Sequence, residues 1–321
     1  IKQFSRDFDL VIAALGYEKR SRFVCEVISP RARFRECCGF QNDQVLSFSY
    51  NQKWFSDAGF QVEIHDNDGF VKWIDRVLQQ VTESDERPIR ILVDISSQTR
   101  FRIAAIVDAL VSHSADLEFE VEFAYSLAAF SAPPAEASVI ATAGPVLDRF
   151  AGWSAQPELP VSVVVGAGYE PDKVLGVIEY LEPGTVWVWV PHGKDGRFLD
   201  AIQHANQSLW DYVSTEHRIG YSVMNPYETF IRLESLCYGL MRWSRPVLVP
   251  FGPKIFALVS MLVALHWPEE LSVWRVSGEQ SETPVDCEAE GSLSGLRVTF
   301  SAARDFSEVN DDIASPALSD T

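Results

Sequence analysis

The chain has 321 residues, of which 47% are hydrophobic and 22% charged, and this balance argues against a disordered, collagen-like or coiled-coil protein. At ~100 to 200 residues per domain, the length predicts two domains or one large one. The net charge of −18 disfavours nucleic-acid binding over a broad face, although a local basic pocket can still hold a small anion. The longest apolar stretch, 256–265, is far shorter than the ~20 residues of a membrane helix, so no membrane association is expected.

Cysteine usage and the N-terminus both bear on location. The five cysteines form no C-x-x-C pair, and their odd number fits reduced thiols in a cytosol better than a disulfide framework. Residues 1–9 are polar and charged and show no apolar signal segment. We therefore expect a cytoplasmic protein.

An internal duplication organises the chain. The apolar run 10–15 is followed by Gly16-Tyr17-Glu18, and the run 161–165 is followed, after Gly166 and Ala167, by Gly168-Tyr169-Glu170. The tripeptide recurs at an offset of 152 positions (168 − 16), each time between a strand-like run and a helical pattern. Repeats of this kind indicate equivalent structural units.

Later elements keep the same order in both halves. In the first half we predict further strands at 45–48, 62–65, 91–93 and 119–125, and helices at 68–81 and 103–111. In the second half we predict strands at 186–190, 221–224, 247–249 and 271–276, and helices at 226–243 and 256–265. Because strands that alternate with helices pair in parallel through crossover connections, we predict an α/β protein of two tandem, internally duplicated Rossmann-like domains, each with a doubly wound parallel sheet.

The predicted boundaries follow composition. Residues 1–135 form the first repeat, 136–154 a linker rich in Ala, Pro and Ser, and 155–280 the second repeat. Residues 281–321 are a C-terminal extension, with a disordered tail from Ser301 that carries several acidic residues.

Polar residues crowd the start of the predicted helix 103–111. Asp94 ends a strand, and Ser96-Ser97-Gln98-Thr99-Arg100 follows it. Backbone N–H groups at a helix start attract anions, and Arg100 can add a bidentate contact to phosphate. The alternative is simple helix capping by Ser96 or Ser97. The equivalent segment of the second half, Gly252-Pro253-Lys254, offers one cation at the matching strand end.

The segment Gly166-Ala167-Gly168 is similar to a dinucleotide fingerprint, but Pro171 stands where a third glycine belongs. The next strand ends in Val190-Pro191-His192, without the acidic residue that would take a ribose hydroxyl. We therefore expect no NAD and no other cofactor, and the glycines alternatively serve only a tight turn.

Candidate acid–base residues are Glu18, Asp94, Glu170 and His192, because all four follow predicted strands at the edge where ligands bind in such sheets. The six histidines show no metal-ligand spacing, so no metal site is expected. Asn225-Pro226-Tyr227-Glu228 is typical of a capped helix start, and Glu228 can pair with Arg232 one turn later.

The order of strand, Asp94, Ser96-Ser97-Gln98-Thr99-Arg100 and helix resembles the ligand loop of CRISPR-associated Rossmann-fold (CARF) sensor domains, which carry Thr-Gly-Gly-Thr-Lys there. Both glycines of that loop are replaced in this chain. The Gly-Tyr-Glu loops are similar in placement to the second ligand loop of the family. The resemblance implies paired domains with a cyclic oligonucleotide in a symmetric cleft, which a tandem duplication would imitate.

Our leading functional expectation is a nucleotide-like phosphate ligand, such as a second messenger in antiviral defence, bound in the cleft between the halves. The alternatives are an enzyme that hydrolyses or transfers a nucleotide or sugar phosphate, and a scaffold subunit of a defence complex. The expected partners are a small anionic ligand and a separate effector protein. The expected ligand-binding residues are Gly16, Tyr17, Glu18, Asp94, Ser96, Ser97, Gln98, Thr99, Arg100, Gly168, Tyr169, Gly252 and Lys254.

Overall fold

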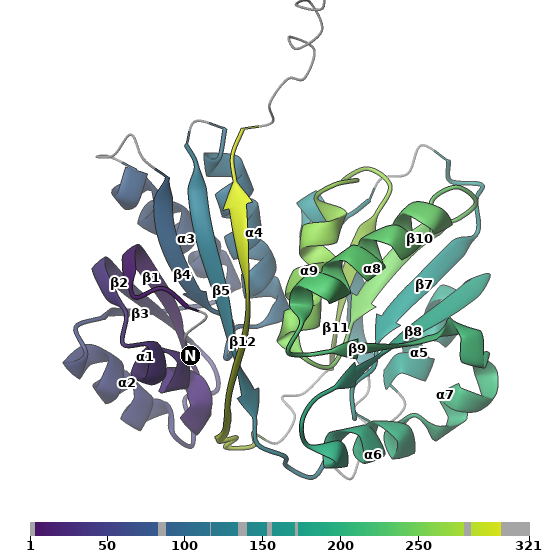
Figure 1. Cartoon of the computed structure of the whole chain (residues 1–321), viewed down its shortest axis with the longest axis horizontal. Helices are drawn as coiled ribbons and strands as arrows, with labels where there is room; N and C mark the ends of the chain where they lie inside the picture. The colour runs from purple at the N-terminus through teal and green to yellow at the C-terminus, as the bar shows by residue number, and fades with distance from the viewer. Residues whose placement is uncertain are drawn as a thin grey trace, which may run out of the picture.

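The computed structural model describes residues 4–82, 88–115, 117–133, 140–152, 156–170, 173–278 and 284–302. It has two six-stranded sheets that stand side by side, one in each half of the chain (Figure 1). The predicted disordered tail from Ser301 lies outside the described residues, except for 301 and 302.

The first half provides five parallel strands. The elements are β1 (Asp7–Leu15), α1 (Phe23–Ile28), β2 (Arg31–Phe40), α2 (Phe48–Asp57), β3 (Gln61–His65), α3 (Asn67–Thr82), β4 (Ile89–Asp94), α4 (Arg100–His113) and β5 (Phe119–Ala128). The strand order is β12-β5-β4-β1-β2-β3, and β12 (Ala289–Phe300) is the one antiparallel member among the described strands of this sheet.

The second half repeats this arrangement. The elements are β6 (Ile140–Pro145), β7 (Val161–Gly166), α5 (Lys173–Leu181), β8 (Thr185–His192), α6 (Gly196–Ala205), α7 (Gln207–Tyr212), β9 (Arg218–Ser222), α8 (Pro226–Leu240), β10 (Arg245–Pro250), α9 (Lys254–Ala264) and β11 (Ser272–Gly278). Its sheet order is β6-β11-β10-β7-β8-β9, with β6 antiparallel to β11. Both halves are therefore Rossmann-like, as the sequence predicts.

One predicted strand is wrong. The second strand of the first half is β2 at Arg31–Phe40, whereas residues 45–48 form a turn that leads into α2. The first half of β2 alternates exposed and partly buried residues. Its arginines interrupt the hydrophobic pattern, so the segment looks polar in the sequence. A strand with one solvated face shows alternating polar and apolar residues, whereas a strand buried on both faces shows a continuous apolar run.

One edge strand of the first sheet comes from the end of the chain. After β5 the chain crosses to the second sheet, where β6 pairs with β11, and after β11 it returns to the first sheet, where β12 pairs with β5. Figure 1 shows β12, in yellow, beside β5 in the middle of the molecule. The predicted linker 136–154 thus contains a strand of the second sheet, and the predicted extension 281–321 contains a strand of the first sheet.

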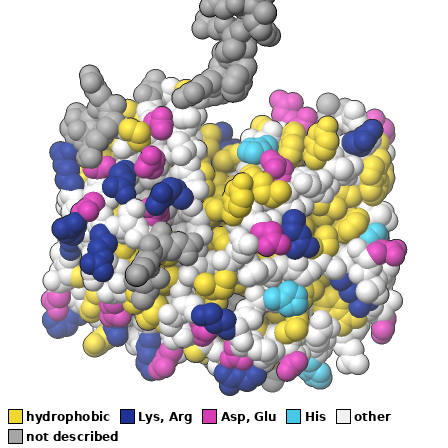
Figure 2. All heavy atoms as spheres, viewed as in Figure 1, with side chains coloured by type: hydrophobic (Ala, Val, Ile, Leu, Met, Phe, Trp, Pro, Cys, Tyr) yellow, Lys and Arg dark blue, Asp and Glu magenta, His cyan; other side chains and the backbone are white. Residues whose placement is uncertain are grey.

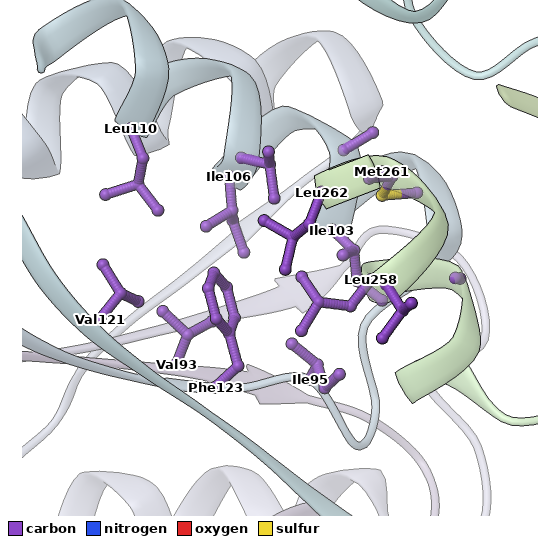
Figure 3. Packing of buried hydrophobic residues seen from close by; sticks show 14 of the residues in the cluster. Val93, Ile95, Ile103, Ile106, Leu110, Val121, Phe123, Leu258, Met261 and Leu262 are labelled. Carbon is purple, nitrogen blue, oxygen red and sulfur yellow. The ribbon is translucent and has the colours of Figure 1, made fainter. Parts of the chain in front are cut away.

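A shared hydrophobic core joins the halves. Helices α4 and α9 pack against each other, and one buried cluster contains residues of both sheets. Figure 3 shows Ile103 and Ile106 of α4 facing Leu258, Met261 and Leu262 of α9, above the inner strands of the first sheet. On the other faces, α1 and α2 cover the first sheet, and α5, α6 and α7 cover the second.

The surface is mixed in charge. On the face shown in Figure 2, Lys and Arg side chains are interspersed with Asp and Glu and do not gather into one basic surface. Within the described ranges, no helix has both the length and the apolar character to cross a lipid bilayer.

We predict that Leu258→Ala, at a fully buried position of α9, lowers the free energy of unfolding by about 2–5 kcal/mol because it leaves a cavity in the shared core. Amide hydrogen exchange in α4 should accelerate together with that in α9. Chemical denaturation measures the first effect, and Val71→Ala, at a 40% exposed position of α3, is the control. Equal small losses for both variants would contradict a shared core.

Candidate functional site

A cavity of about 210 Å³ lies where loops from the carboxyl ends of strands in the two sheets meet. Such sheet edges are the usual ligand sites of open α/β folds. Its lining residues are Glu18, Arg20, Tyr125, Leu127, Ala128, Ala167, Gly168, Tyr169, Glu170, Pro191, Gly193, Phe198, Ile202, Val223, Gly252, Pro253, Lys254 and Cys287. A larger hollow of about 680 Å³ is lined by Asp108, 145–149 and Pro268, away from these loops, and we do not treat it as the site.

Two cations cross the boundary between the halves in a reciprocal manner. Arg100, the first residue of α4, donates to the backbone oxygens of Pro250 and Gly252, the latter at 3.0 Å. Lys254, the first residue of α9, donates to the backbone oxygen of Ser96 at 2.7 Å. Arg100 and Lys254 are 154 positions apart (254 − 100), and so are Ser96 and Pro250 (250 − 96). The two contacts therefore join equivalent positions of the two repeats.

Lys254 also lines the cavity. Burial lowers the pKa of its ammonium to about 8, although the nearby carboxylates of Glu18 and Asp94 oppose that shift. The guanidinium groups of Arg20 and Arg100 lower the pKa further. An anion in the cavity would act in the opposite direction and favour the protonated amine.

Arg20 is the second cation of the cavity, and we did not predict it. Its side chain is 7% exposed, pairs with Glu18 and donates from Nη1 to the backbone oxygen of Ser126 at 3.0 Å. Burial opposes its charge, but Glu18 and Tyr125 outweigh that effect and hold its pKa above the usual value. The sequence feature that could have indicated Arg20 is its position, two residues after Glu18 in the loop that follows the first strand.

The segment before β12 holds Arg20 from the other side. The backbone N–H of Arg20 donates to the backbone oxygen of Cys287 at 3.1 Å. The carboxylate of Asp286 accepts from the backbone N–H of Lys19 and from the hydroxyl of Ser47, both at 2.7 Å. A distant part of the chain thus fixes the first Gly-Tyr-Glu loop.

Two buried asparagines hold the Gly-Tyr-Glu loops in equivalent ways. The amide of Asn51 donates to the backbone oxygens of Gly16 and Glu18, at 2.9 and 2.8 Å, and that of Asn206 donates to the backbone oxygen of Gly168 at 2.8 Å. A Cβ on Gly16 would lie 2.9 Å from Ser97 Cβ, and one on Gly168 would lie 3.2 Å from the backbone nitrogen of Gly252. Each glycine allows its loop to approach the loop after the fourth parallel strand of its half.

The segment 94–99 lies behind the cavity, and its residues do not line it. Asp94 Oδ1 accepts from the backbone N–H of Ser96 at 2.8 Å, and Thr99 caps α4 by accepting from the backbone N–H of Arg102. The alternative of capping by Ser96 or Ser97 therefore assigned the wrong residue. Asp94 Oδ2, the Ser97 hydroxyl and both amide atoms of Gln98 are buried without a hydrogen-bond partner among the described residues.

The structure brings together only part of the predicted site. Glu18, Gly168, Tyr169, Glu170, Gly252 and Lys254 line the cavity. Gly16 and Tyr17 support its first loop, and Arg100 braces the loop of Gly252 without lining the cavity. His192 is exposed, and its ring lies against Gly220 of β9, outside the cavity. Farther away, Asn225 caps α8 and Glu228 pairs with Arg232, as predicted.

Comparisons with known proteins add no family: no protein-family model matches the chain, and no curated protein matches it. Among the described residues, no group of three or more His, Cys, Asp or Glu side chains is arranged to hold a metal ion.

Asp94 allows a test of the electrostatics around the cavity. Burial raises its pKa to about 6, so the folded protein binds a proton there between pH 4 and 6 that the unfolded chain has already released. The carboxyl of Asp94 therefore costs stability as the pH rises through this range. We predict that Asp94→Asn gains about 1–3 kcal/mol of stability relative to wild type between pH 4 and pH 7.

Denaturant unfolding at several pH values measures this gain, with Asp211→Asn, at an exposed position of α7, as the control. A difference between Asp94→Asn and wild type that stays constant from pH 4 to pH 7 would show that Asp94 titrates normally.

Proposed function

We propose that the cavity between the halves binds a small nucleotide-like phosphate ligand, whose phosphate lies against Arg20 and Lys254. The observation that carries this proposal is that one cavity is lined by two cations, one from each half, of which Arg20 is buried and Lys254 partly buried. Two carboxylates, those of Glu18 and Glu170, line the same cavity, and Glu18 pairs with Arg20, so the two cations there stand against two acidic groups before a ligand binds.

The charges in the cavity are suited to an added anion. Removing an ammonium from water is costly unless it is paired, and the partly buried Lys254 Nζ donates to a neutral backbone oxygen. The carboxylate of Glu18 does not neutralise Lys254 alone, because it pairs directly with Arg20. Lys254 has three N–H donors and Arg20 has five, so both can donate to a phosphate while they keep their present contacts.

The resemblance to CARF domains supports the same class of ligand, since those domains bind phosphate-containing messengers between paired Rossmann-like units. The reciprocal contacts of Arg100 and Lys254 provide a comparable pseudo-symmetric pair within one chain. A role in antiviral defence, with a separate effector protein as partner, belongs to this proposal.

The two other expected functions have less support. An enzyme would use Glu18 or Glu170 at the cavity, but Asp94 does not line it and His192 lies outside it. A scaffold would not need two cations at a cavity. Ligand binding uses the residues that line the cavity and requires no catalytic group from outside it.

We predict that Lys254→Met weakens the binding of adenosine 5′-monophosphate by about 1.5–3 kcal/mol, the contribution of a hydrogen bond to a charged group. Isothermal titration calorimetry measures the affinity, and a thermal melt shows that the variant is folded. Lys53→Met, at an exposed position of α2, is the matched control and should bind as wild type does. Equal affinity for all three proteins would contradict the proposal.

The affinity of the wild type should also depend on pH. Because the pKa of Lys254 is lowered to about 8 and a bound phosphate raises it, binding should be full below pH 8 and fall by up to about tenfold per pH unit above it. Lys254→Met should show no such fall between pH 7 and pH 9. A wild-type affinity that is flat across this range would exclude Lys254 as the phosphate ligand.

A further inference from the structure

The cavity has a second, apolar set of lining side chains beside its charged residues. The ring of Tyr169 lies 6.0 Å from that of Phe198, and Phe198 packs edge-on against Phe130 at 5.2 Å. Ile202, one turn after Phe198 on α6, also lines the cavity. An occupant that carried only phosphate groups would leave these side chains unused.

The aromatic side chains lie close to the cations. The charge of Arg20 acts on the hydroxyl of Tyr169, and the guanidinium of Arg20 lies 5.9 Å from the centre of the Tyr125 ring. Burial raises the pKa of Tyr169 to about 12, which keeps it neutral. A neutral, partly apolar wall beside two cations is suited to a ligand that has one ring and one anionic group.

The size of the cavity limits the occupant. Pockets for drug-sized molecules have about 300–1,000 Å³, and this cavity has about 210 Å³. A cyclic oligonucleotide, with several bases and several phosphates, exceeds this space, whereas a single phosphate and a single ring agree with it.

We infer that the ligand is one mononucleotide-sized phosphate ester, with its ring against Tyr169 and Phe198 and its phosphate against Arg20 and Lys254. The inference rests on the proposed function and specifies the class of ligand. It differs from the expectation of a cyclic oligonucleotide, because the volume of the cavity limits the ligand to one base.

Calorimetric titration with four probes tests the inference: inorganic phosphate, ribose 5-phosphate, adenosine 5′-monophosphate and cyclic tetra-adenylate. We expect the monophosphate to bind about tenfold or more tightly than ribose 5-phosphate, since stacking of a base on an aromatic ring contributes on this scale. Cyclic tetra-adenylate should bind more weakly than the monophosphate.

Two substitutions locate the ring. Phe198→Ala should abolish the difference between the monophosphate and ribose 5-phosphate and leave the affinity for ribose 5-phosphate within about twofold. Phe198→Leu keeps most of the apolar volume but removes the aromatic ring. If this variant is folded and also loses the difference between the two ligands, the loss reflects stacking and not misfolding. Tyr212→Ala, at a 60% exposed position of α7, is the control and should keep the difference.

The outcomes separate the inference from the proposed function. Equal affinity for the monophosphate and ribose 5-phosphate, or tighter binding of cyclic tetra-adenylate, would overturn the inference while phosphate binding still stands. A difference that survives in Phe198→Ala would also overturn it. Failure of all four probes to bind would overturn the proposed function as well.

Discussion

The reciprocal contact of Arg100 and Lys254 is the interaction on which the rest of the structure depends. Each cation begins a helix of one half and donates to backbone oxygen between the end of the preceding strand and the equivalent helix of the other half, Arg100 to Pro250 and Gly252 and Lys254 to Ser96. A hydrogen bond from a charged donor contributes about 1.5–3 kcal/mol, more than one between neutral groups. Because the same loops carry Gly252 and Lys254 to the cavity, the contact that joins the halves also sets the shape of the site.

The surrounding fold makes this contact rigid. Helices α4 and α9 continue from the two cations into the shared core, and β12 returns from the end of the second half to pair with β5 of the first sheet. Sites supported by packed helices and strands hold their geometry better than sites on isolated loops. The cavity is therefore a fixed feature between two interlocked domains, and a ligand would not have to bring the halves together.

The sequence predicted the duplicated order of elements and the equivalence of Arg100 and Lys254, because both depend on local patterns that recur at a constant offset. It did not predict the partners of these cations, which are backbone oxygens some 150 positions away. Arg20 was missed for the same reason, since contacts with Cys287 and Ser126 bury and hold it. The strand β2 was missed because its arginines interrupt the apolar pattern.

The return of β12 to the first sheet has a consequence for the synthesis of the chain. The first sheet lacks its outer strand until β12 is made, and the ribosome must extend the chain from residue 128 to residue 289 before pairing can begin. At ~5–20 residues per second, this interval lasts roughly 8 to 30 s. An uncovered strand edge is a template for pairing with other chains. The newly made first half therefore passes through its most aggregation-prone period while its own second half is being translated.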